Sequence, residues 1–249
     1  MNKHKVLRKP EFGQKTADFL NIVYKDYLAA RVLLNNDLLI QGAVLASTAI
    51  EKYFKAILAF SGKENSSHLK KAHFNMVKNF DPKLWGDLNE DFIRLLQRAY
   101  HLRYLDKLEK NFNPVIASRE FLAELDFTVL IIQNSFHLNK NGEEVVLMYH
   151  QDKNSNDSRL FYNNYLLTEI EKQSFISAKD QLVYEIRKCP LGGFFEVEYL
   201  TMPQPSDGKF MRTGFELQED KEKIIKYQTA FKEITPLHCS RDGAVLRRV

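Results

Sequence analysis

The sequence predicts a mainly α-helical protein, in which an up-and-down helical bundle is followed by a smaller α+β unit. Three observations lead to this fold class. The 249 residues contain only 10 Gly and 7 Pro, and so few breakers favour helices over turn-rich β structure. Apolar residues of the first half recur at steps of three and four, the spacing of a helix with one buried face. The second half instead contains short β-branched runs and partial alternation, which indicate strands.

The predicted bundle consists of helices joined by short connections, which implies antiparallel neighbours. Each helix is ended by residues that disfavour its continuation, for example Asn35-Asn36-Asp37, Ser61-Gly62 and Asp81-Pro82. Ser118 is a candidate N-cap for the last helix. We expect helices over about residues 16–35, 39–60, 69–80, 87–102 and 118–138. Asp87, Glu90 and Asp91 are placed in the first turn of the fourth helix, where carboxylates favour the helix dipole.

The second half is expected to mix strands and helices. The segment 160–167 is compatible with either a strand or a helix, and 152–158 is a polar loop. Strands are expected at 144–149 and in a hairpin-like pair, 194–202 with 209–217, and helices at 168–188 and 220–234. We place the domain boundary near Lys140-Asn141-Gly142, which gives a helical bundle over 1–140 and an α+β domain of unknown role over 141–249.

The charge differs between these two parts. Residues 1–140 hold 21 Lys and Arg against 15 Asp and Glu, a net charge of +6, whereas residues 141–249 carry a net charge of −2. The overall charge of +4 averages over the two. A basic half is compatible with a nucleic-acid or nucleotide partner, and also with an ordinary Lys-rich helical surface.

Composition excludes several classes of protein. Two cysteines cannot form a disulfide framework, so a reducing, cytoplasmic location is expected. The basic start lacks the apolar region of a secretory signal. The longest apolar stretch, around 127–132, is far shorter than the ~20 residues of a transmembrane helix, and we expect no membrane association.

Common phosphate and metal motifs are absent from the sequence. It contains no G-x-x-x-x-G-K-[ST] loop, no G-x-G-x-x-G turn, no C-x-x-C and no H-E-x-x-H. His68 and His73 are poorly spaced for two ligands on one helix face, so no metal and no cofactor are expected. Cys189 precedes Pro190 and is interpreted as a small buried side chain in preference to a nucleophile.

The segment 94–104 carries the most informative chemistry. Arg94 and His101 are seven positions apart, which is close to two helical turns, so they share a face, and Arg98 lies between them. Arginine binds phosphate through its fork of donors, and histidine moves protons near neutral pH. Together they suit RNA cleavage by the 2′-hydroxyl, which needs no metal. The alternative is a solvated basic face beside a packed histidine.

Several segments together resemble HEPN domains (higher eukaryotes and prokaryotes nucleotide-binding), over about residues 14–138. The E-K-x-x-K core of such domains is matched by Glu51, Lys52 and Lys55 within 33–58. Further similarities are His73-Phe74-Asn75-Met76-Val77, which resembles an H-x-L-type helix start, the Arg103-Tyr104 pair within 100–104, and the final helix at 118–138.

The resemblance implies an all-α bundle, often a homodimer, that binds RNA or a nucleotide. Many members are metal-independent endoribonucleases with an R-x(4–6)-H motif, found in toxin–antitoxin or phage-defence systems, with one composite site across the dimer. Arg94 and His101 match that motif at its upper length and become candidate catalytic residues. Candidate nucleotide- or RNA-binding residues are Arg98, Arg103, Tyr104, Glu51, Lys52 and Lys55.

Alternatives remain open at several of these positions. Leu95 after Arg94 and Leu105 after Tyr104 depart from the family pattern, and both departures are compatible with a non-catalytic module that pairs with a minimal nucleotidyltransferase. Glu51 and Lys55 also suit a simple i,i+4 ion pair, worth ~0.2–0.5 kcal/mol. Tyr104 either packs in the core, which is the preferred expectation, or stacks on a base.

Overall fold

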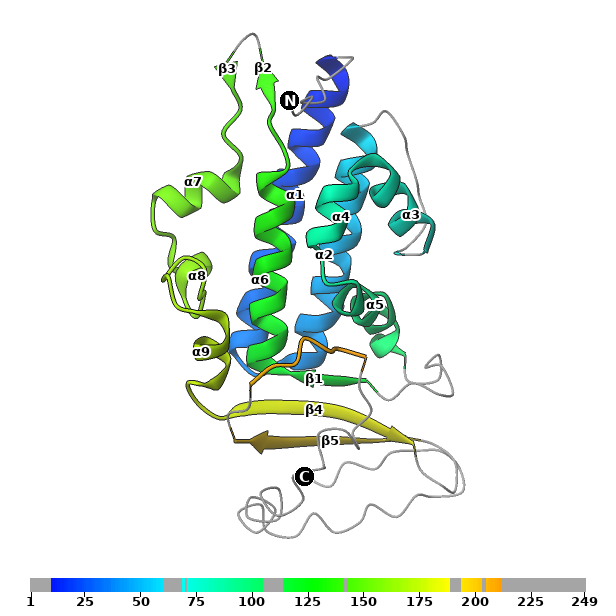
Figure 1. Ribbon diagram of the computed structural model, residues 1–249, viewed down its shortest axis with the longest axis vertical. Coiled ribbons are helices and arrows are strands. Elements are labelled where there is room, and N and C mark those ends of the chain that lie inside the picture. Colours follow the sequence, from blue (N-terminus) through cyan, green and yellow to red (C-terminus); the bar gives the residue numbers. More distant parts are fainter. Residues whose placement is uncertain are drawn as a thin grey trace.

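The computed structural model describes residues 10–60, 69, 71–104, 114–140, 143–188, 194–202 and 205–211. Within these ranges the protein is mainly helical, with a small antiparallel sheet at one end of the helices (Figure 1). The prediction of a mainly α-helical bundle is therefore confirmed for this part of the chain. The predicted helix at 220–234 and the residues 212–217 of the predicted hairpin lie outside the described residues.

Three long helices run along the long axis of the molecule, α1 (Pro10–Asn35), α2 (Leu39–Phe60) and α6 (Ser118–Asn134) (Figure 1). A tight turn joins α1 to α2, and Asp37 adopts a left-handed conformation there with φ 61°. At the start of α2, a Cβ on Gly42 would lie 2.6 Å from Leu34 Cγ. Glycine therefore permits the two helices to approach this closely.

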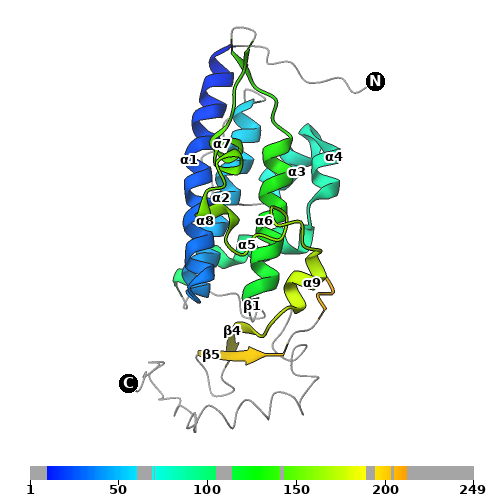
Figure 2. The same ribbon diagram turned by 90° about the vertical axis from the view of Figure 1, so that its left-hand side faces the viewer.

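Shorter helices flank this bundle on two sides (Figures 1 and 2). One side carries α3 (Lys71–Phe80), α4 (Pro82–Asp87), α5 (Glu90–Ala99) and the 3₁₀ helix η1 (Tyr100–Arg103), and the other carries α7 (Met148–Asn154), α8 (Ser158–Phe161) and α9 (Lys172–Ser177). Among the described residues, no helix combines the length and apolar character needed to cross a membrane.

Helix α4 is a difference from the sequence-based expectation. Asp81-Pro82 ends α3 as expected, but it also begins a new helix, because the Asp81 carboxylate accepts a hydrogen bond from Leu84 N at 3.0 Å and Pro82 occupies the first turn. Asp87 consequently ends α4 and does not stand in the first turn of α5, where Glu90 and Asp91 do lie. Ser118 is likewise a helical residue and Ala117 occupies the N-cap position, without a side-chain cap.

The sheet lies across one end of the long helices (Figures 1 and 2). Its strand order is β1-β4-β5, both pairs are antiparallel, and β4 is central. The strands are β1 (Val115–Ala117), β4 (Gln181–Lys188) and β5 (Phe194–Thr201). A second, two-stranded pair at the other end consists of β2 (Asn139–Lys140) and β3 (Glu143–Glu144).

The predicted strand at 144–149 is wrong beyond its first residue. The chain enters α7 at Met148, whose backbone N–H donates to Asn21 Oδ1 at 3.2 Å. Tyr149 is buried edge-on against Tyr24 of α1, with 5.8 Å between the ring centroids. Packing against α1 therefore overrides the local β-branched pattern, as expected for a propensity that depends on context.

The predicted helix at 168–188 is wrong in its second part, where α9 is followed by the central strand β4. Val183, Tyr184 and Ile186 are all fully buried. Tyr184 and Ile186 belong to the main core, whereas Val183 packs with side chains of β1 and β5. Strand β5 confirms the expected strand at 194–202, but its partner is β4, and residues 209–211 form no strand. The short strand β1 was not predicted.

Side chains from both parts of the chain share one hydrophobic core. Leu147, Tyr149 and Phe175 belong to the same cluster of buried residues as α1, α2 and α6. A fully buried ion pair between Arg31 of α1 and Asp126 of α6 lies in this interior. The division of the chain near residues 140–142 stays a prediction, and packing crosses it.

Candidate nucleotide-binding surface at the end of helix α5

Helix α5 and η1 bury one side and expose the other. Leu95, Leu96 and Ala99 are fully buried and Leu102 is nearly so, which seats both helices on the bundle. The residues of opposite orientation are exposed. We call Arg94, His101, Arg103 and Tyr104 the α5–η1 surface. The burial of Leu95 explains why an apolar residue follows Arg94.

Arg94 and His101 both reach solvent on the α5–η1 surface. The Arg94 guanidinium pairs with Glu90 at 2.6 Å, but the two side chains are 57% and 49% exposed, so the pair is weak. The imidazole of His101 makes no hydrogen bond within the described part of the chain, and its ring stands edge-on to Tyr100. Five α-helical and two 3₁₀ steps separate the two residues by about 11 Å along the axis. Arg98, between them, is half-buried.

Arg103 is held by aromatic rings. Its guanidinium carbon lies 3.9 Å from the centroid of the Tyr100 ring and 5.6 Å from that of Tyr104, and its Nε donates to the Tyr100 carbonyl at 3.3 Å. No carboxylate pairs with it among the described residues. Tyr104 is 49% exposed, so the preferred expectation that it packs in the core is wrong.

The three candidates on α2 have partners of their own. Glu51 is buried, pairs with Lys55 at 2.7 Å and accepts a hydrogen bond from Leu69 N at 3.1 Å. Lys52 pairs with Asp26 of α1 at 2.5 Å. These contacts hold α1, α2 and the approach to α3 together. A ligand-binding role for these residues stays a prediction.

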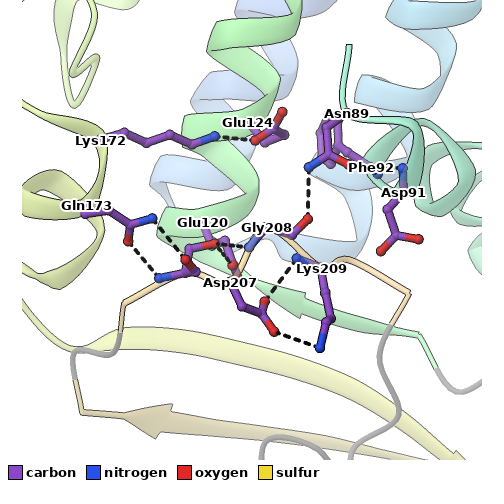
Figure 3. Close-up of polar contacts among 11 residues, drawn as sticks. Asn89, Asp91, Phe92, Glu120, Glu124, Lys172, Gln173, Asp207, Gly208 and Lys209 are labelled. Carbon is purple, nitrogen blue, oxygen red and sulfur yellow. Dashed lines mark hydrogen bonds and ion pairs between the residues drawn. The ribbon is translucent and has the colours of Figure 1, made fainter. Parts of the chain in front are cut away.

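The N-terminal end of α5 is fixed by a segment from much later in the chain, residues 205–211. The Asn89 side chain caps α5 by accepting from Asp91 N and Phe92 N, and its amide donates to the Gly208 carbonyl at 2.9 Å (Figure 3). The Asp91 carboxylate oxygen Oδ2 accepts two backbone N–H groups, from Phe210 at 2.6 Å and Met211 at 2.8 Å.

Helices α6 and α9 hold the other end of the segment 205–211 (Figure 3). The Gln173 side chain makes two hydrogen bonds to the backbone of Ser206, at 2.8 and 3.0 Å, and the Ser206 hydroxyl donates to Glu120. Phe210 is buried, with its ring centroid 4.9 Å from that of Phe92. The segment therefore joins α5, α6 and α9, and helps to position the helix that carries the α5–η1 surface.

Two elements of this region were not identified from the sequence. The Tyr100 ring contacts the Arg103 guanidinium. The spacing of these two residues, three positions apart on a helix, is the sequence signal that predicts such a contact. The segment 205–211 gave no comparable signal, because its hydrogen-bond partners lie between 33 and 120 residues away in the sequence. Within the described ranges, no group of three or more His, Cys, Asp or Glu side chains is arranged to hold a metal ion.

No family model matches the chain, and neither the curated proteins nor the solved structures contain a significant match to it.

Proposed function

We propose that this protein binds RNA or a nucleotide through the α5–η1 surface. The observation that carries the proposal is the joint exposure of Arg94 on α5, His101 and Arg103 on η1, and the tyrosine that follows η1. Arginine binds phosphate through its guanidinium group, and nucleic-acid bases stack on aromatic rings. The +6 net charge of residues 1–140 adds electrostatic attraction for a polyanion.

The proposal includes metal-independent cleavage of RNA by Arg94 and His101. In this reaction the 2′-hydroxyl oxygen bonds to the adjacent phosphorus and its proton passes to water, while the bond from phosphorus to the 5′-oxygen breaks. Arg94 holds the phosphate oxygens, and protonated His101 gives its proton to the leaving 5′-oxygen. The products are a 2′,3′-cyclic phosphate and a free 5′-hydroxyl.

The resemblance to HEPN domains extends the proposal to a homodimer and to a toxin–antitoxin or defence role. The side chains of the α5–η1 surface are exposed in one chain, and in this proposal a second copy facing them completes an enclosed site. The ion pair between Arg94 and Glu90 does not oppose this, because an exposed pair is worth only ~0–1 kcal/mol and gives way to a phosphate. A non-catalytic module that pairs with a nucleotidyltransferase keeps the same binding surface without cleavage.

An RNA-binding and cleavage assay in EDTA tests the proposal with full-length protein. We expect His101→Ala to abolish cleavage and retain binding, and Arg103→Ala to weaken binding. Arg159→Ala is the control for loss of an exposed arginine, because Arg159 is 58% exposed and lies on α8, outside the α5–η1 surface. Binding without cleavage supports the non-catalytic form, and the absence of binding to any RNA or nucleotide contradicts the proposal.

A further inference from the structure

The arrangement of Tyr100, Arg103 and Tyr104 is more specific than a basic patch. The Arg103 guanidinium lies close to the Tyr100 ring at 3.9 Å and is tied to the Tyr100 carbonyl through Nε. Contact with an aromatic ring together with a hydrogen bond limits the orientations of the guanidinium group. The cation is thus held in place beside the exposed ring of Tyr104, 5.6 Å away.

Arg103 differs from two other exposed arginines in its charge environment. Arg94 and Arg159 each have a carboxylate within 3 Å, whereas Arg103 has no acidic partner in the described part of the chain. An exposed cation without a carboxylate partner, next to a tyrosine that is 49% exposed, is complementary to a ligand that carries both an anion and a flat ring. A nucleotide has these two groups, whereas an acidic peptide would use the cation alone.

Base pairing decides which nucleic acids can use this arrangement. In a duplex each base is covered on both faces by its neighbours, so only an unpaired base can present a face to a tyrosine ring. Leu102 is buried and anchors the turn, and the backbone becomes extended at Tyr104, with φ −138° and ψ 96°. This leaves the Tyr104 side chain 49% exposed at the end of η1.

We propose that Tyr104 and Arg103 form a subsite for one unpaired nucleotide of single-stranded RNA. The base stacks on the Tyr104 ring, and the phosphate of the same nucleotide contacts Arg103. His101 lies on the same 3₁₀ turn, so the neighbouring phosphodiester passes the proposed catalytic residue. The inference rests on the proposed function and adds its substrate class.

The test uses two measurements on full-length protein. Fluorescence anisotropy compares the affinity for a single-stranded RNA and for a duplex of the same length. A second single strand carries 2-aminopurine at its 3′ end, where stacking on an aromatic side chain quenches fluorescence. The variants are Tyr104→Phe, which keeps the ring, and Tyr104→Leu, which removes it. Tyr162→Leu is the matched control, because Tyr162 is 61% exposed and follows α8 at its C-cap, as Tyr104 follows η1.

We expect the single strand to bind more tightly than the duplex, and we expect the fluorescence of its 2-aminopurine to be quenched when the protein binds. Tyr104→Leu lowers single-strand affinity roughly 5- to 150-fold, the range for loss of one base stack, and removes quenching. Tyr104→Phe, which keeps the ring, retains quenching, and Tyr162→Leu leaves both unchanged. Equal binding of single strand and duplex, unaffected by Tyr104→Leu, overturns this inference and leaves the proposed function standing. The absence of all RNA and nucleotide binding overturns the proposed function as well.

Discussion

Replacing Asp91 with alanine is expected to release the segment 205–211 from helix α5. The Asp91 carboxylate accepts the backbone N–H groups of Phe210 and Met211 at 2.6 and 2.8 Å. A hydrogen bond to a charged group contributes about 1.5–3 kcal/mol. Both donors share one oxygen, and the side chain is only half-buried, so their contributions do not add fully. We expect Asp91→Ala to lower the free energy of unfolding by about 2 kcal/mol.

Glu90→Ala is the matched control for this substitution. Glu90 stands in the same first turn of α5, so its removal costs the same interaction with the helix dipole, about 0.3–1 kcal/mol, together with a weak exposed ion pair to Arg94. No hydrogen bond or ion pair joins it to the segment 205–211 among the described residues. Asp91→Asn keeps an acceptor oxygen without the charge and should lie between the two variants.

Denaturant unfolding followed by circular dichroism gives the free energies, and hydrogen exchange gives the local effect. The amides of Phe210 and Met211 should exchange faster in Asp91→Ala and remain protected in Glu90→Ala. The reasoning is refuted if Asp91→Ala is no more destabilising than Glu90→Ala, or if these two amides keep their protection.

Three further predictions concern the scaffold. Gly42→Ala should lower the free energy of unfolding by about 1–3 kcal/mol through overpacking. Gly86→Ala should be neutral or stabilising, because a Cβ there meets nothing within 4 Å, and equal effects of the two variants in thermal melts would contradict this. Asp126→Asn leaves the buried Arg31 charge without its counter-charge and should cost about 3–5 kcal/mol in denaturant unfolding, and a cost below 1 kcal/mol would show that the pair does not matter. Burial lowers the pKa of His150, so the folded protein binds this proton less readily than the unfolded chain does. The free energy of unfolding should therefore fall as the pH drops below about 6.5. His150→Gln should reduce that fall between pH 7 and 5, and an unchanged pH profile would contradict the assignment.

The helices of the bundle could be predicted because their signal is local. Val23, Tyr27, Ala30 and Leu34 recur at helical spacing and are all buried in α1, as their periodicity indicates. The strand β4 could not be predicted in this way. Its apolar residues are buried by the main core and by side chains of β1 and β5, which lie far from one another in the sequence. The same residues also fit a helical stripe. Period alone does not separate these alternatives over a short apolar run.

The exposure of two candidate site residues could be predicted for the same reason. The spacing of Arg94 and His101 placed them on one helical segment, and the structure shows both of them exposed there. The conformation of Tyr104 could not be predicted, because the helix changes to a 3₁₀ turn at Tyr100 and the chain then extends. Nor could the contact between Asn89 and Gly208, which are 119 residues apart.

Ultraviolet cross-linking tests the central claim most directly, because it reports which surface touches the ligand. Full-length protein would be irradiated with a single-stranded RNA containing 4-thiouridine, and the modified peptides identified by mass spectrometry. We predict cross-links within residues 94–104, which are lost on competition with unlabelled single-stranded RNA and reduced in Arg103→Ala. The absence of cross-links, or cross-links confined to residues outside the α5–η1 surface, would contradict the account.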